Sequence, residues 1–127
     1  MPMKILDTNI LIRFLTNDDA NLAEQAENIL RTAAKSSLKL YDVVFVEIIF
    51  VLQSVYQLKK ETIVEIVSLL ITFSAINCNK KLLGQTLWLF DEHSISIVDA
   101  YLLARAQLAP NSQIETFDLK LKRLTQR

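Results

Sequence analysis

Residues 38–52 read LKLYDVVFVEIIFVL, a short alternating segment followed by a long apolar run. Leu38–Tyr41 has the pattern of a β-strand, and Asp42 suits the N-cap of a helix. The run that follows predicts that helix, in which Glu47 is a lone carboxylate among nine apolar side chains. The stretch therefore predicts one strand-to-helix unit with an acid in its apolar helix.

The burial of that acid is the strongest expectation from the sequence. A helix that is apolar on every side is expected to be buried on most of its faces. A buried, unpaired carboxylate costs several kcal/mol or gives up its charge by protonation. We therefore expect Glu47 to have a positive partner, either a basic side chain or a metal ion.

The same alternation of strands and helices continues along the chain. Predicted strands are Met3–Leu6, Leu38–Tyr41, Ala75–Cys78 and Gln113–Phe117, and predicted helices cover 8–15, 18–35, 42–52, 60–72, 80–93, 96–108 and 119–124. Such alternation implies right-handed βαβ crossovers and a mostly parallel sheet. We predict an α/β fold, with a central four-stranded sheet between two layers of helices.

Composition limits the class of protein. The chain has 127 residues, 51% of them hydrophobic and 22% charged, with a formal net charge of zero. These values fit one globular domain over residues 1–127 and argue against a protein that mainly coats nucleic acid. Cys78 is the only cysteine and Gly84 the only glycine, which excludes a disulfide framework and a glycine-rich phosphate loop. Without a signal-peptide pattern or a membrane-length apolar run, we expect a cytoplasmic protein with no membrane partner.

Three further acids lie in apolar surroundings. Asp7 and Asp118 each follow a predicted strand, and Asp99 lies at the start of a predicted helix. In open α/β sheets, sites form beyond the carboxyl ends of the strands. Asp7, Asp99 and Asp118 can therefore converge there with Glu47.

Each of these three aspartates also has a structural interpretation. Asp7 and Asp118 occupy positions where an aspartate commonly caps the following helix, which contributes about 1 kcal/mol. Ser96 and Asp99 have the spacing of a capping box. Capping alone would leave a non-catalytic α/β interaction module, so that alternative stays open.

The chain as a whole resembles the PIN domain family, and in particular VapC-type toxins of toxin–antitoxin pairs. The resemblance is carried by Asp7-Thr8-Asn9 after the first strand, Glu47 in an apolar helix, Val98-Asp99-Ala100, and Thr116-Phe117-Asp118 after the last strand. It implies a metal-dependent endoribonuclease that hydrolyses RNA phosphodiester bonds. Asp7, Glu47, Asp99 and Asp118 would be its catalytic metal ligands.

The resemblance also implies cofactor and partners. Clustered carboxylates without histidine or cysteine suit Mg²⁺ or Mn²⁺. Asn9 and Thr116 fit accessory polar positions, and an RNA substrate, a cognate antitoxin and a homodimer are the expected partners. Lys120, Lys122 and Arg123 form a basic tail that can contact the RNA backbone.

Two departures and one rival interpretation accompany the resemblance. Many relatives carry a further acid shortly after the final aspartate, where this chain has Lys120, which can weaken a second metal site. The chain also lacks the short last strand of some members, which is why four strands are expected. A PIN nuclease outside toxin–antitoxin systems is the closest alternative function.

Overall fold

The structure is a computed structural model that describes residues 2–126. The chain divides at Asn79 into two compact units, and each is described by itself. The first unit contains the sheet and four helices, and the second, from Lys80 onward, contains three helices. No helix within residues 2–126 is long and apolar enough to cross a membrane.

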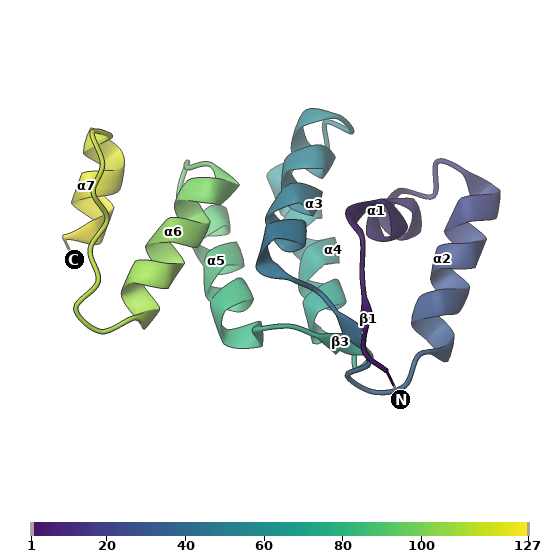
Figure 1. The fold of residues 1–127 in the computed structure, drawn as a ribbon. Helices are drawn as coiled ribbons and strands as arrows, with labels where there is room; N and C mark the ends of the chain where they lie inside the picture. Colours follow the sequence, from purple (N-terminus) through teal and green to yellow (C-terminus); the bar gives the residue numbers. More distant parts are fainter. Residues whose placement is uncertain (1, 127) are drawn as a thin grey trace. The chain divides into compact units, whose positions relative to one another are not determined.

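The sheet of the first unit is parallel, in the order β1-β2-β3. Its strands are β1 (Lys4–Ile5), β2 (Leu38–Lys39) and β3 (Ile76–Asn77). Each crossover carries two helices, α1 (Thr8–Thr16) and α2 (Ala20–Thr32) after β1, and α3 (Asp42–Ser54) and α4 (Lys60–Thr72) after β2 (Figure 1). The predicted α/β class and parallel sheet are confirmed.

Alternation along the short strands gives the sheet two different faces. Leu6, Leu38 and Leu40 are at most 3% exposed. On the opposite face, Ile5 is 67% exposed and Tyr41 is 48% exposed. Because successive strand residues point to opposite faces, one face of the sheet belongs to the core and the other lies at the surface.

Helix α3 packs on α1 and on α4, and it supplies much of the core of the first unit. Phe45, Ile48, Ile49 and Leu52 recur at helical spacing and are at most 1% exposed. Each such side chain stabilises the fold by about 1.5–3 kcal/mol relative to an exposed position. This apolar face fixes the orientation of α3, and with it the direction of every other side chain on the helix.

The second unit consists of α5 (Lys80–Glu92), α6 (Ile97–Leu108) and α7 (Leu119–Thr125). Helix α6 contacts both α5 and α7. It begins after Ser96, whose hydroxyl accepts a hydrogen bond from the Asp99 backbone N–H, and it ends before Pro110. The residue before a proline disfavours helical geometry, which explains that boundary.

Two local predictions are wrong. Residues 113–117, expected as a fourth strand, form no strand, so the sheet of the described chain has three strands. An extended segment becomes a strand only where a neighbouring strand pairs with it, and residues 80–126 of the second unit contain none. Asp42 is the first residue of α3, and Tyr41 holds the N-cap position.

A polar network joins two loops of the first unit. The Tyr56 hydroxyl donates to Asp18 Oδ2 at 2.7 Å, and Arg13 Nη1 donates to Asp18 Oδ1 at 3.0 Å. The Thr16 hydroxyl also donates to Asp18, at 3.1 Å. These groups hold the pKa of Asp18 below its ordinary value, with the Tyr56 hydrogen bond as the largest cause.

This network predicts a pH-dependent effect of Tyr56→Phe. A carboxyl group with a lowered pKa stabilises the fold above its unfolded pKa, and that contribution is lost as the pH falls through the folded pKa. We expect Tyr56→Phe to lower Tm near pH 7, and the difference from the parent to shrink as the pH drops below about 4. Thermal unfolding of the variant and the parent across this pH range measures the difference in Tm, with Tyr41→Phe as the matched control. An equal loss of Tm at every pH would contradict a role through the Asp18 carboxylate.

Candidate active site

Asp7 lies just beyond the carboxyl end of β1. It is exposed and is the N-cap residue of α1, where its Oδ1 accepts a hydrogen bond from the Thr8 backbone N–H at 2.9 Å. The predicted cap is confirmed. Since no bond to its second carboxylate oxygen lies within the described residues, that oxygen remains free to bind a ligand.

Glu47 does not lie where the sequence placed it. It is exposed, on the side of α3 opposite the buried face. Val43 and Phe50 lie one turn to either side of it and are 75% and 59% exposed. The expectation of a buried carboxylate is therefore wrong, because an apolar run without periodicity does not reveal which face of the helix is covered.

Asp99 and Asp118 belong to the second unit. Asp99 is half-buried in the first turn of α6. Asp118 is the exposed N-cap of α7, and its Oδ1 accepts from the Leu121 backbone N–H at 2.9 Å. Helices α6 and α7 run in the same direction, so their acid-bearing N-terminal ends lie at the same end of this unit (Figure 1).

The accessory polar residues have different surroundings. Thr116 is half-buried, and its Oγ1 accepts from the Asp118 backbone N–H at 3.0 Å. This bond shapes the turn that presents Asp118. Asn9 is exposed in the first turn of α1, two residues after Asp7.

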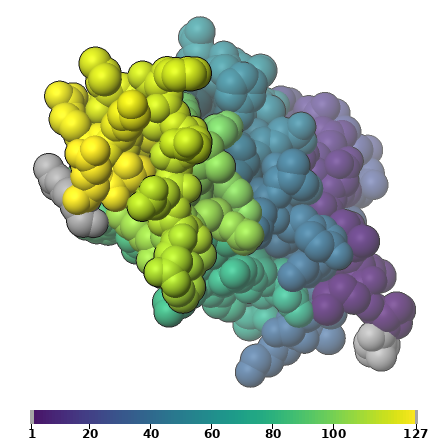
Figure 2. Space-filling view, turned by 60° about the vertical axis from the view of Figure 1, so that its left-hand side comes forward, coloured from purple at the N-terminus to yellow at the C-terminus, as the bar shows by residue number. Residues whose placement is uncertain are grey.

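The basic residues of α7 are exposed but not equivalent. The Lys120 ammonium donates to the Ser94 backbone carbonyl at 3.1 Å, which ties α7 to the loop before α6. The side chains of Lys122 and Arg123 make no hydrogen bond or ion pair with any described residue. Figure 2 shows α7 and the segment leading into it, in yellow, as an open surface of the second unit.

Two exposed aromatic side chains lie next to these acids, and neither is among the predicted site residues. Phe117 is fully exposed, at 101%, immediately before Asp118. Tyr41 is 48% exposed at the end of β2, and the β1–β2 register carried two residues onward places it level with Asp7. For Phe117 the available signal was an aromatic residue directly before a candidate acid.

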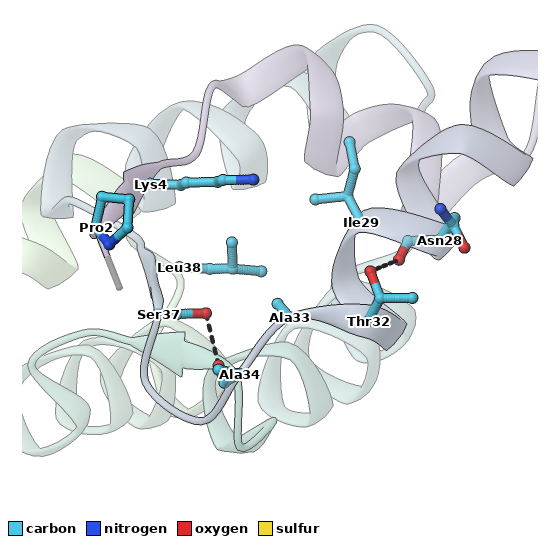
Figure 3. Close-up of a pocket in the computed structure, with 9 residues that line it drawn as sticks. All are labelled: Pro2, Lys4, Asn28, Ile29, Thr32, Ala33, Ala34, Ser37 and Leu38. Carbon is cyan, nitrogen blue, oxygen red and sulfur yellow. Dashed lines mark hydrogen bonds between the residues drawn. The ribbon is translucent and has the colours of Figure 1, made fainter.

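A cavity of about 520 Å³ opens in the first unit away from these acids. Figure 3 shows the Lys4 side chain pointing into it between Leu38 and Ile29. Lys4 and Leu38 are the first residues of their strands, so the cavity lies at the amino end of the sheet. Asp7 lies at the opposite, carboxyl end, and the cavity is therefore separate from the candidate site.

Each unit thus presents two of the four predicted acids. Asp7 and Glu47 belong to the first unit, and Asp99 and Asp118 to the second. Within either unit taken alone, residues 2–126 include no group of three or more acid, histidine or cysteine side chains placed to hold a metal ion.

Comparison with known families identifies the fold. The PIN domain family matches residues 4–126, nearly the whole chain and both units. The chain belongs to the PIN domain family. Proteins of this family are generally nucleases that depend on Mg²⁺ or Mn²⁺. No match was found among curated proteins.

The acids of this PIN domain have the chemistry that such an ion requires. All four are carboxylates, which are hard oxygen ligands suited to Mg²⁺ and Mn²⁺. None of the four forms an ion pair with a basic side chain of the described chain, in contrast to Asp18, which pairs with Arg13. Their charges are therefore not neutralised by the protein, and they fit a cation.

Substitution of Asp118 separates capping from charge in the PIN domain. Asparagine caps a helix about as well as aspartate, whereas alanine costs about 1 kcal/mol. We expect Asp118→Ala to lower the free energy of unfolding by about that amount and Asp118→Asn to leave it nearly unchanged. Denaturant unfolding in EDTA measures both variants. An equal loss of unfolding free energy in the two variants would contradict a stabilising role for the hydrogen bond from the Leu121 N–H to Asp118.

The exposure of Glu47 predicts a small effect on folding. Glu47→Gln removes a charge from a surface position without a partner, so we expect the free energy of unfolding in EDTA to change by less than about 0.5 kcal/mol. Phe45→Ala, two residues earlier on the buried face, should cost about 3–5 kcal/mol. A loss of several kcal/mol from Glu47→Gln would show that the carboxylate serves the fold.

Proposed function

We propose that this PIN domain is a metal-dependent endoribonuclease, the toxin of a type II toxin–antitoxin pair acting in the cytoplasm. The observation that carries the proposal is the family match over residues 4–126, together with acids at each motif position that resembles the family's metal ligands. The absence of basic partners for these acids within the described chain supports it.

In this proposal Asp7, Glu47, Asp99 and Asp118 hold Mg²⁺ or Mn²⁺. When bound, such an ion activates water and stabilises the charge that develops during hydrolysis of a phosphodiester bond. The hydrogen bonds from the Thr8 and Leu121 N–H groups orient the Asp7 and Asp118 carboxylates, and the second oxygen of each is left for the cation.

Polar and basic residues complete the proposed site. Thr116 positions Asp118 through its backbone N–H, and Asn9 supplies an exposed amide near Asp7. Lys122 and Arg123 contact the phosphate backbone of the RNA. Lys120 can also contact a phosphate, because its ammonium group has further N–H donors besides the one that bonds to the Ser94 carbonyl.

An apolar groove in the first unit supports a protein partner. It has a volume of about 260 Å³ and contains residues of α1, α2 and α4. Among them Leu69 is 68% exposed, Phe73 42% and Phe14 37%. Apolar surface of this kind favours docking of an antitoxin segment, and the exposed apolar side chains elsewhere favour a homodimer.

The proposal predicts metal-dependent cutting of RNA. Purified protein incubated with total cellular RNA and Mn²⁺ should create new 5′ ends at defined positions, which sequencing of the ends maps. EDTA should abolish the cuts, and Glu47→Gln should reduce the cleavage rate by at least about 100-fold because it removes a metal ligand. Glu65→Gln, another exposed glutamate on a helix, is the matched control and should cut normally.

Two outcomes would contradict the proposal. Cuts that survive Glu47→Gln would overturn the assignment of the site. Folded protein, shown free of antitoxin, that cuts nothing in either metal would favour the non-catalytic interaction module.

A small antitoxin gene immediately upstream, whose product blocks the cuts, distinguishes the toxin from a PIN nuclease outside toxin–antitoxin systems.

A further inference from the structure

We infer that Phe117 is a stacking platform for an unpaired RNA base next to the scissile phosphate. The inference rests on the proposed function and deepens it, because it selects single-stranded or looped RNA as substrate. It is based on a fully exposed aromatic ring that immediately precedes Asp118 in the chain. Asp118 is one of the proposed metal ligands.

The exposure of Phe117 is unusual for its residue type. Phenylalanine is among the side chains most often buried, and this one is 101% exposed, with no contact that covers it. Four residues later, Leu121 is only 2% exposed and anchors α7 to its unit. Leu121 therefore serves the core, whereas Phe117, like Leu119 at 73%, lies exposed.

Hydrogen bonds hold the backbone on the C-terminal side of Phe117. The Asp118 N–H donates to Thr116 Oγ1 at 3.0 Å, and the Asp118 carboxylate caps α7. The Lys122 N–H donates to the Asp118 carbonyl at 3.0 Å, and the Lys120–Ser94 bond fixes the helix to the preceding loop. A base stacked on the ring would thus lie close to an Asp118 carboxylate whose orientation is restrained.

Charge indicates the kind of partner. Helix α7 carries three basic residues, Lys120, Lys122 and Arg123, and no acid. An exposed aromatic ring that precedes a basic helix is a combination that binds single-stranded nucleic acid, because the ring stacks on a base while the cations hold the phosphates. A second copy that paired this surface with itself would bring two basic helices together, which disfavours that occupant.

The test measures binding to two short oligonucleotides of about ten nucleotides, oligoadenylate and its abasic counterpart. Asp7→Asn, which keeps the α1 cap, stops cleavage in the parent and in every variant. We expect Phe117→Ala to weaken binding of oligoadenylate by roughly 5- to 100-fold and to leave binding of the abasic chain unchanged. Lys122→Ala combined with Arg123→Ala should weaken binding of both.

A spectroscopic readout tests contact directly. In a Trp88→Phe background, Phe117→Trp should lose fluorescence when oligoadenylate is added and should keep it with the abasic chain. Leu119→Trp, two residues away and 73% exposed in the parent, is the matched reporter and should change little.

Several outcomes would overturn the inference. These are undetectable binding of oligoadenylate by the parent, equal binding by Phe117→Ala, an equal loss on both oligonucleotides, and a change in self-association caused by Phe117→Ala. Failure of the proposed function is distinguishable from failure of this inference. In that case base-dependent binding through Phe117 is observed, but protein with the wild-type Asp7 cuts no RNA in Mg²⁺ or Mn²⁺.

Discussion

Parallel pairing of three very short strands is the constraint on which the first unit depends. The strands exchange few hydrogen bonds, among them Lys4 N–H to the Ser37 carbonyl and Leu38 N–H to the Ala75 carbonyl, each 2.9 Å long. Parallel strands can be joined only by crossovers, so each connection must leave the sheet and return. The helices of those crossovers cover the buried face, and the carboxyl ends of β1 and β2 are left side by side. Asp7 and Tyr41 lie at those ends.

Helix ends determine how the other acids are presented. Three of the four candidate ligands lie at an N-cap or in the first turn of a helix, where backbone N–H groups are unpaired and favour negative charge. The same carboxylate can therefore stabilise the fold and remain available to a cation. Capping and metal binding are compatible roles for Asp7 and Asp118, and evidence for one is no argument against the other.

Much of the fold could be predicted from the sequence. The helix predicted over Lys60–Thr72 has those bounds in the structure. The predicted cap at Ser96 is confirmed as well. These features depend on local signals such as apolar spacing and capping residues. The parallel arrangement of the sheet was predicted from the alternation of strands and helices along the chain.

The errors came from properties that local sequence does not determine. Residues 113–117 have the composition of a strand, but a strand also needs a pairing edge. Glu47 lies in a run that is apolar on every side, so the sequence could not show that Phe45 and Ile48 face the core while Glu47 faces outward. The exposure of Phe117 was missed for a related reason, because the segment that ends with it was interpreted as part of the sheet. Glu47 and Asp99 could be proposed as site residues from the order of motifs, whereas their surroundings required the structure.

The two capping hydrogen bonds have an entropic consequence. A free aspartate side chain samples several rotamers, and immobilising a side chain on binding costs about 0.5–1.5 kcal/mol. In Asp7 and Asp118 that freedom is already restricted by the bonds from the Thr8 and Leu121 N–H groups, before any ligand arrives. Glu47 is longer and has no such bond. The described chain therefore has two carboxylates whose rotation is restrained during folding, whereas the Glu47 carboxylate keeps its rotational freedom.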